Sequence, residues 1–236
     1  MSLIEILRIP HMSLAENEKV VKIEGWEHME KALERGKGVI LFATHIDNVD
    51  LGGCSMAMRG VPISVVVRKM GKSAEQFISS VRENTGVTII PGKNSKTYIR
   101  ELLAENKIVT IVADQHISKK NRSIACKFFG QWASTTTAPS RFAFETDAAI
   151  IPAVINRQGK TRYHRVRVFP AFEQETPYND MDMNIRHNTE RLNRIIEQWI
   201  REAPDQWWWI HKRWKVQDNP EGWDIPQDNS SEDQSN

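Results

Sequence analysis

The chain has 236 residues, of which 40% are hydrophobic and 26% are charged, with a formal net charge of +2. This composition is typical of a globular protein and excludes a disordered, collagen-like or coiled-coil chain. Two cysteines without metal-binding spacing exclude a disulfide scaffold and favour a reducing compartment, and no run of 18 apolar residues encodes a transmembrane helix.

The charge is distributed unevenly. The last 21 residues, from Val216, contain six acidic residues and no Lys or Arg, so residues 1–215 carry about +8. A body this basic suits an anionic partner: phosphate, an anionic membrane, an acidic carrier protein or nucleic acid. A solvated surface with spare lysines is the open alternative. The polar tail 216–236 is expected to be a disordered acidic segment.

Residues 1–24 are expected to be an N-terminal segment without a secretory signal, and their few apolar residues leave a membrane-surface helix open. Between residues 25 and 215, apolar runs alternate with helical patterns. Strands are expected at 38–44, 61–67, 86–90, 108–113, 148–155 and 163–169, and helices at 48–59, 73–84, 95–106, 136–145 and 181–203.

Most of these runs are continuously apolar, which is typical of strands buried on both faces. The alternation of strands and helices predicts an α/β fold with a mostly parallel central sheet flanked by helices. Residues 38–44 are expected at its centre, and the alternating run 163–169 at its edge.

The first candidate site, T-H-I-D-N-V-D-L-G-G (44–53), follows the central strand. Ligands bind at the carboxyl ends of strands in parallel sheets, which places His45 where chemistry occurs. Asn48 is expected to cap the next helix. Asp50 is expected to fold back on the His45 ring and orient it as a general base, so Asp50→Asn should lower turnover more than stability. Two residues that merely cap a helix are the alternative.

The second candidate, V-A-D-Q-H (112–116), places Asp114 at the end of another buried strand. With His45, Asp47 and His116 it would make a divalent metal site, but the spacing is unfamiliar and we expect no metal. Cys54 is expected to pack rather than react.

Basic residues form a third group: Arg68 ends a predicted strand, Arg82 lies on the helix that follows it, and Lys93 follows the next predicted strand. Arg at this rim can bind phosphate or stabilise an oxyanion, so we expect substrate binding there. Scattered solvated residues are the alternative, above all for residues 119–122.

Five of the eight tryptophans lie between residues 199 and 214, among His and basic residues. Core packing, a membrane interface and a nucleic-acid stacking platform all fit this pattern. We expect a lipid-facing surface made by Trp207, Trp208, Arg213 and Trp214, with no nucleic acid.

In combination, H-x4-D, VRENTGVTIIPG, ADQH, TTTAPSRFAFETDAAIIPAV and PDQWWWIHKRWK resemble the lysophospholipid acyltransferase superfamily. Within it, the chain is similar to the lipid A biosynthesis (lauroyl and myristoyl) acyltransferases. The resemblance covers residues from about Gly25 to Lys215, the expected acyltransferase domain. The E-G-T-R block of the glycerolipid branch is absent from the sequence.

The resemblance implies a glycerolipid-acyltransferase-like fold, His45 as general base and Asp50 as its orienting residue. It also implies that Arg68, Arg82 and Asp114 serve substrate binding and active-site structure, and Thr135 and Thr136 match the family's Thr-rich stretch. Thr136 is therefore included among the expected substrate-binding residues.

The expected activity is O-acyl transfer from a thioester of acyl carrier protein or coenzyme A to a hydroxyl of a lipid A precursor or related glycolipid. No covalent acyl-enzyme and no other cofactor are expected. The resemblance implies that the protein binds peripherally to the cytoplasmic face of the bacterial inner membrane. Family members usually also carry an N-terminal anchoring helix. A glycerolipid or lysophospholipid acyltransferase and a non-catalytic membrane-binding module are the alternatives.

Overall fold

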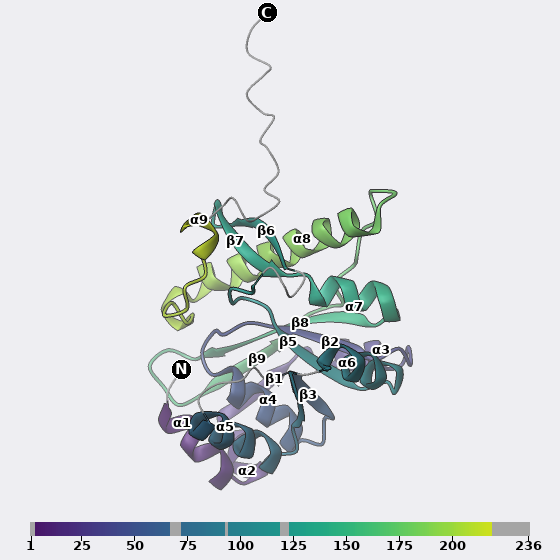
Figure 1. Cartoon of the computed structure of the whole chain (residues 1–236). Coiled ribbons are helices and arrows are strands. Elements are labelled where there is room, and N and C mark those ends of the chain that lie inside the picture. The colour runs from purple at the N-terminus through teal and green to yellow at the C-terminus, as the bar shows by residue number, and fades with distance from the viewer. Residues whose placement is uncertain (1–2, 67–71, 93, 119–122, 219–236) are drawn as a thin grey trace, which may run out of the picture.

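A seven-stranded, mostly parallel sheet forms the centre of the protein (Figure 1). The computed structural model describes residues 3–66, 72–92, 94–118 and 123–218. The strand order is β1-β9-β8-β2-β5-β3-β4, and the β8–β9 pair is antiparallel while the other pairs are parallel. The strands are β1 (Val21–Glu24), β2 (Val39–Ala43), β3 (Ile63–Val66), β4 (Thr88–Ile90), β5 (Ile108–Val112), β8 (Ala149–Arg157) and β9 (His164–Val168).

The predicted α/β class, the six predicted strands and the central place of β2 are confirmed. The prediction that the last strand lies at an edge is wrong, because β9 lies between β8 and β1. The edge is formed by β1, a four-residue strand of sequence VKIE that pairs in parallel with β9. A strand this short, with two charged residues, gives almost no hydrophobic pattern.

Helices cover both faces of the sheet, as the continuous apolar strands require. The apolar residues of β2 alternate between two cores: Val39 and Leu41 face one, Ile40 and Phe42 the other. The first core is shared with α1, α3, α4 and α5, and the second with α6, α7 and α8. The helices are α1 (Leu3–Arg8), α2 (Leu14–Val20), α3 (Trp26–Leu33), α4 (Val49–Met58), α5 (Lys72–Asn84), α6 (Ser95–Ala104), α7 (Ala138–Thr146), α8 (Met181–Glu202) and α9 (Lys215–Asp218).

The start of β2 depends on Gly38, which has a φ of +72°. A Cβ at this position would lie 2.5 Å from the carbonyl oxygen of Leu103. Only glycine combines this backbone with so close an approach, which fixes the central strand against the end of α6.

An antiparallel hairpin, β6 (Ser123–Phe128) and β7 (Gln131–Thr136), packs on α8 outside the main sheet. Thr136 therefore ends a strand, and the helix expected from 136 begins at Ala138. The hairpin was not predicted, since Ser, Thr, Gln and Lys interrupt its hydrophobic pattern.

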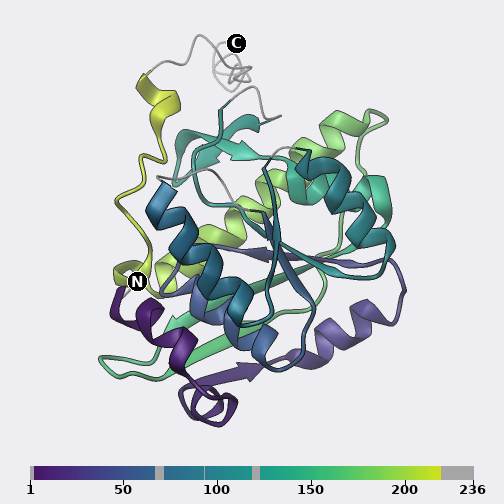
Figure 2. The same ribbon diagram turned by 60° about the horizontal axis from the view of Figure 1, so that its bottom comes forward.

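Helix α1 lies near the segment that follows α8 (Figure 2). Arg157 of β8 links the two, because its side chain pairs with Glu5 of α1 at 2.6 Å and its backbone amide donates to the side chain of Gln206 at 2.8 Å. Ile6, Ile9 and Val21 are buried in the first core, so residues before 25 pack on the same sheet. The predicted tail, 216–236, begins too early, because Val216 is buried and lies in α9. From 219 onward the tail lies outside the described residues. None of the described helices is long and apolar enough to cross a membrane.

Candidate active site

Strand register brings His45 and Asp114 together. Ala43 of β2 pairs with Val112 of β5, and the amide of Ala113 donates to the carbonyl of Ala43 at 3.0 Å. His45 and Asp114 each lie two residues beyond the Ala43–Val112 pair, so they lie beside each other. Both are at the carboxyl edge of the sheet, the rim at which the sequence places them.

Asp114 is the carboxylate that orients His45. Its Oδ1 lies 2.7 Å from His45 Nδ1, and its Oδ2 accepts from the His45 backbone amide at 3.0 Å and from Trp207 Nε1 at 2.8 Å. The residue is 2% exposed. Burial alone would raise the pKa of Asp114, but the His45 charge and these hydrogen bonds outweigh it and hold the pKa below its ordinary value. Asp114 thus stays ionised and keeps the ring proton on Nδ1.

The other ring nitrogen of His45 contacts the side chain of Gln115. Its Nε2 lies 3.2 Å from the amide nitrogen of Gln115, and the Trp208 ring packs edge-on at 5.9 Å. With the proton held on Nδ1, Nε2 has the lone pair that accepts a hydrogen bond. This nitrogen is therefore arranged to accept a proton.

The expectation that Asp50 orients the His45 ring is wrong. Asp50 lies in the first turn of α4, where its Oδ1 accepts from Arg82 of α5 at 2.8 Å from Nε and 2.7 Å from Nη2. Asn48 caps α4 as predicted, accepting from the Leu51 amide at 3.1 Å. Because Asp50 lies in the first turn of α4, its side chain points toward α5. The register of β2 and β5 instead places Asp114 beside the His45 ring. Arg82 is correspondingly engaged in joining α5 to α4.

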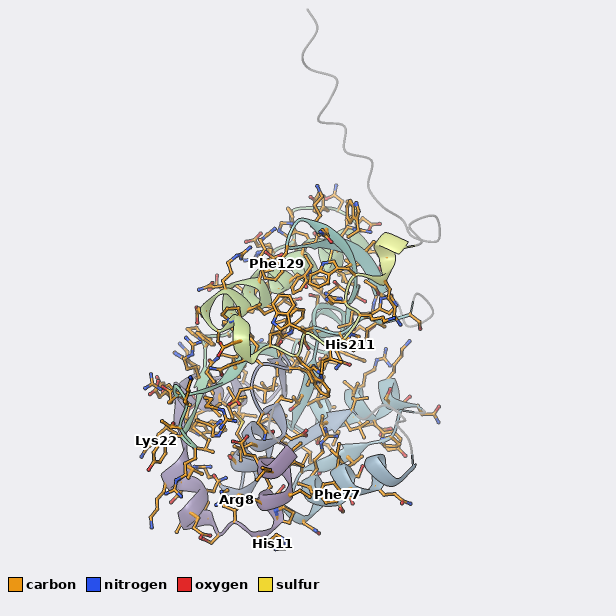
Figure 3. The ribbon with its side chains drawn as sticks, turned by 90° about the vertical axis from the view of Figure 1, so that its left-hand side faces the viewer. Arg8, His11, Lys22, Phe77, Phe129 and His211 are labelled. Atoms are coloured by element: carbon orange, nitrogen blue, oxygen red, sulfur yellow. The ribbon has the colours of Figure 1, made fainter. Side chains whose placement is uncertain are left out.

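The Trp-rich segment pairs with the histidine loop through its backbone. Trp207 makes an antiparallel bridge with Ile46, the Trp208 amide donates to the His45 carbonyl at 3.1 Å, and the Asp47 amide donates to the Gln206 carbonyl at 2.8 Å. His211, a few residues later, lies on the molecular face turned to the viewer in Figure 3. Through these backbone contacts, residues 206–208 pack along residues 45–47.

Most of the expected lipid-facing surface is buried, which corrects that prediction. Trp207 is 4% exposed and Arg213 0%, while Trp214 is partly buried and donates to the Phe128 carbonyl at 3.1 Å. Trp208, at 38%, is the exposed member of the predicted set. Hydrogen bonds inside the protein occupy the indole N–H groups of Trp207 and Trp214 and the guanidinium of Arg213. These groups are therefore not available to a lipid headgroup.

Arg213 fastens the hairpin to α8. It donates to the Ser134 carbonyl, to Thr135 Oγ1 at 2.8 Å and to Asn193 Oδ1 at 3.3 Å, and it lies 4.8 Å from the centre of the Phe128 ring. Burial lowers the pKa of Arg213. The Thr-rich stretch therefore has a structural use: Thr135 binds this cation.

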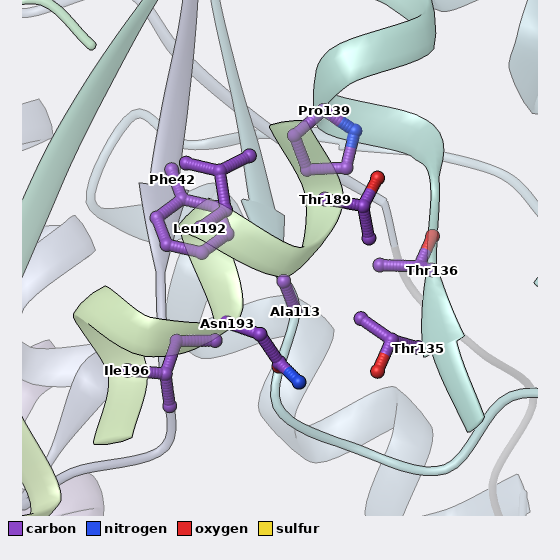
Figure 4. Close-up of a pocket in the computed structure, with 9 residues that line it drawn as sticks. All are labelled: Phe42, Ala113, Thr135, Thr136, Pro139, Thr189, Leu192, Asn193 and Ile196. Atoms are coloured by element: carbon purple, nitrogen blue, oxygen red, sulfur yellow. The ribbon is translucent and has the colours of Figure 1, made fainter. Parts of the chain in front are cut away.

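Thr136 lies beside a small cavity that Ala113, the residue before Asp114, also lines (Figure 4). The cavity has about 10 Å³, the space of about one water molecule. Thr136 Oγ1 accepts from the Ala138 amide at 3.2 Å at the start of α7. The other lining residues are Phe42, Thr135, Pro139, Thr189, Leu192, Asn193 and Ile196.

Two expected substrate-binding residues, Arg68 and Lys93, lie outside the described residues. Among the residues that the structure describes, no three His, Cys, Asp or Glu side chains are arranged to hold a metal ion. Cys54 is buried, and burial raises the pKa of its thiol to about 11, so the thiolate that a nucleophile needs is disfavoured.

The sequence interpretation assigned Trp207 to a lipid-facing surface and did not single out Gln115. The signal for Gln115 was its place beside Asp114 at a strand end. For Trp207, no sequence signal identified the carboxylate that its indole would contact.

The fold and the site define an α/β protein with a hydrogen-bonded His45–Asp114 pair at the carboxyl edge of its sheet. The chain belongs to the bacterial lipid A biosynthesis acyltransferase family, which it matches over residues 1–216. This match confirms the resemblance seen in the sequence motifs.

Individual relatives are distant. The chain is 26% identical to a phosphatidylinositol mannoside acyltransferase of Mycobacterium tuberculosis, covering 89% of this chain and 66% of that one. It is 25% identical to the lipid A biosynthesis palmitoleoyltransferase of Escherichia coli (82% and 61%) and 22% identical to the lauroyltransferase of the same organism (85% and 63%). The chain thus spans just under two thirds of the length of these relatives.

Proposed function

We propose that the protein is an O-acyltransferase that moves a fatty acyl chain from a thioester to a hydroxyl of a glycolipid, with His45 as general base and Asp114 as its orienting residue. The observation that carries the proposal is the hydrogen-bonded series Trp207–Asp114–His45, which fixes the ring proton on Nδ1 and directs Nε2 to the rim. Family membership supplies the reaction class.

In this mechanism the acceptor hydroxyl replaces the Gln115 amide at His45 Nε2 and gives up its proton to that nitrogen. The acceptor oxygen attacks the thioester carbonyl, and the carbonyl oxygen becomes an oxyanion stabilised by nearby amides or cations. Collapse of the tetrahedral intermediate breaks the carbon–sulfur bond. The thiolate takes the proton from His45. No covalent acyl-enzyme forms, because the acceptor oxygen attacks the thioester directly.

The donor and the acceptor are part of the proposal. An acidic acyl carrier protein and the phosphates of coenzyme A both suit the basic body of about +8. The relatives' names suggest a lipid A precursor or a phosphatidylinositol mannoside as acceptor. We keep Arg68, Arg82, Lys93 and Thr136 as proposed substrate-binding residues, with Arg82 acting from its pair with Asp50.

We further propose that the protein works peripherally at a membrane surface, the cytoplasmic face of the inner membrane. Exposed apolar side chains near the site support this: Ile4 and Leu7 on α1 are 70% and 55% exposed, and Trp208 and Ile210 are 38% and 85%. Phe77 of α5, 41% exposed, lies on the same face as Arg8 and His211 in Figure 3. Apolar side chains mixed with cations are typical of interfacial surfaces.

The central experiment is acyl transfer by the full chain with thioesters of acyl carrier protein and of coenzyme A. The acceptor panel contains a lipid A precursor, a phosphatidylinositol mannoside and a lysophospholipid, and His45→Ala is the control. Transfer to a glycolipid that the variant lacks supports the proposal. Transfer only to the lysophospholipid supports the glycerolipid alternative. Lipid binding without transfer, unaffected by His45→Ala, supports the non-catalytic alternative.

Membrane binding has its own test by vesicle cosedimentation. The double variant Ile4→Asp, Leu7→Asp should bind anionic vesicles at least tenfold more weakly, since about 1.5–3 kcal/mol of apolar transfer is lost per side chain. Met181→Asp is the matched control, because Met181 is 53% exposed and begins the 22-residue α8, at the end farther from the Trp-rich segment. Equal loss in the control would contradict this orientation.

A further inference from the structure

Next to the His45 loop, four charged side chains from distant parts of the chain form one cluster: Glu5 of α1, Asp47 of the loop itself, Arg157 of β8 and His164 of β9. The strands place Arg157 and His164 opposite each other in the antiparallel β8–β9 register. The acyl-transfer steps described above use none of the four.

The cluster is closely connected. His164 Nδ1 lies 2.5 Å from Asp47 Oδ2, and His164 Nε2 lies 3.4 Å from Glu5 Oε1. Arg157 contacts Glu5 Oε1 at 2.6 Å and Glu5 Oε2 at 2.8 Å, and Asp47 Oδ1 at 3.3 Å. Asn48 adds a 3.3 Å hydrogen bond to Glu5. The histidine ring thus has a carboxylate oxygen at each nitrogen.

Two members of the cluster are buried, while the side chains of Glu5 and Arg157 are 17% and 24% exposed. Asp47 is 4% exposed and His164 1%. Buried ionic groups are rarely more stabilising than apolar residues of the same volume, and removal of one partner leaves an uncompensated charge. Hydrogen bonds from Arg157 and Asn48 offset the burial of Glu5 and lower its pKa, and the bond to Glu5 raises the pKa of Arg157.

Asp47 has an unusual backbone. Its φ is +48°, in the left-handed region that side chains disfavour and that Asp and Asn tolerate best. The residue lies two positions after His45 and one before Asn48, the cap of α4. The turn at Asp47 therefore determines the direction of the chain between His45 and α4. The cluster contacts this turn through the side chain of Asp47.

We propose that Glu5, Asp47, Arg157 and His164 are positioning residues that hold the left-handed turn at Asp47 and thereby direct His45 Nε2, and that Glu5 makes α1 a part of this support. The inference rests on the proposed function for its kinetic consequences. Its structural consequence, a fixed His45 ring, does not depend on substrate identity.

The test compares His164→Gln, Asp47→Asn and Glu5→Gln in the full chain. Misplacement of a catalytic group by about 1 Å costs about a hundredfold in rate. We therefore expect kcat to fall about 10–100-fold in His164→Gln and Asp47→Asn and about 3–10-fold in Glu5→Gln, with KM for donor and acceptor changed less than about threefold. The double variant Asp47→Asn, His164→Gln should be little worse than either single variant, because both remove the same support.

The second readout is the nitrogen NMR spectrum of the His45 ring, recorded without substrate, where His45→Ala provides the assignment. A positioning role predicts that the His45 signals shift or broaden in the folded variants. Arg167→Gln is the matched control, since Arg167 lies on the same strand as His164 in a half-exposed pair with Glu202 at 2.7 Å. It should leave both kcat and the ring signals unchanged.

A kcat within about twofold of the unsubstituted protein, together with unchanged His45 signals in folded His164→Gln or Glu5→Gln, overturns the inference. If His164→Gln does not fold, Glu5→Gln decides, because Glu5 is the more exposed of the two carboxylates at 17%. If the unsubstituted protein transfers no acyl chain, the proposed function fails, and the ring spectrum still decides on the cluster.

Discussion

Replacing Asp114 with Asn separates the two carboxylates that could orient His45. The change keeps the size of the side chain and removes its charge. Oδ2 of Asp114 accepts two hydrogen bonds, from the His45 amide and from Trp207 Nε1, whereas Oδ1 accepts one, from His45 Nδ1. The single amide oxygen of the asparagine should therefore take the Oδ2 position, because it then satisfies two donors.

This orientation points the NH2 group of the introduced asparagine at His45 Nδ1. The ring can accept that hydrogen bond only by moving its own proton to Nε2, where it blocks the general base. A buried Asp→Asn change that reverses the histidine tautomer costs about 10⁴ in kcat in Ser-His-Asp enzymes, and we expect about 10³–10⁴ here. Stability should fall by only about 1–3 kcal/mol, the cost of weakening hydrogen bonds to a charged acceptor.

The assay is single-turnover acyl transfer with saturating donor, accompanied by the nitrogen NMR spectrum of His45 and by urea unfolding. Asp50→Asn is the comparison. It weakens the pair with Arg82, in which the Arg82 and Asp50 side chains are 17% and 10% exposed, so it should cost about 1–2 kcal/mol of stability and less than about tenfold in kcat. This reverses the effect expected from the sequence. A kcat loss in Asp50→Asn equal to that in Asp114→Asn, or an unchanged tautomer in Asp114→Asn, would refute the reasoning.

Three further outcomes follow from the same contacts. Trp207→Phe keeps the aromatic packing but removes the indole donor to Asp114, so kcat should fall about 3–30-fold and stability by about 1–2 kcal/mol, measured by kinetics and urea unfolding. Arg213→Ala should cost about 3–5 kcal/mol, because it leaves buried acceptors unpaired and opens a cavity. Arg201→Ala should cost less than about 1 kcal/mol, because the Arg201 side chain is 60% exposed, although its partner Glu197 is 13% exposed. The folded-state pKa of Asp114 is lowered, so its contribution to stability is present above its unfolded pKa of about 3.9 and is lost as pH falls below that value. Unfolding free energies at pH 7 and pH 3 should therefore differ more in the unsubstituted protein than in Asp114→Asn, and equal differences would contradict this.

The fold could largely be predicted because its strands are buried on both faces, so each appears as a continuous apolar run. The exceptions share one property. In the edge strand VKIE and the hairpin 123–136, polar residues interrupt the apolar ones, so the sequences of these segments resemble those of loops. The edge assignment of 163–169 failed for a different reason. Alternation indicates one exposed face, which β9 has, but it does not show whether another strand pairs along the side of the strand, as β1 does.

The sequence predicted only that the site lies at the carboxyl edge of the sheet, not which residues contact each other there. The sequence identifies His45 and Asp114 as strand-end residues, but it does not give the order of strands, and only the neighbouring positions of β2 and β5 bring the two together. Without that register, the local spacing H-x4-D favoured Asp50. The Trp-rich segment was misinterpreted for a related reason. Its composition suits an interface, but its burial depends on pairing with residues 45–47, far away in the sequence.

The pairing of the Trp-rich segment with the histidine loop also has a consequence for the order of folding. The contacts of Asp114 span 69 residues to His45 and 93 residues to Trp207. Contacts between such distant residues form late, since the chain between them must first lose its freedom. During synthesis, Asp114 remains without its indole partner until Trp207 has left the ribosome. Catalytic competence should therefore be the last property to return on refolding, after the sheet itself has formed.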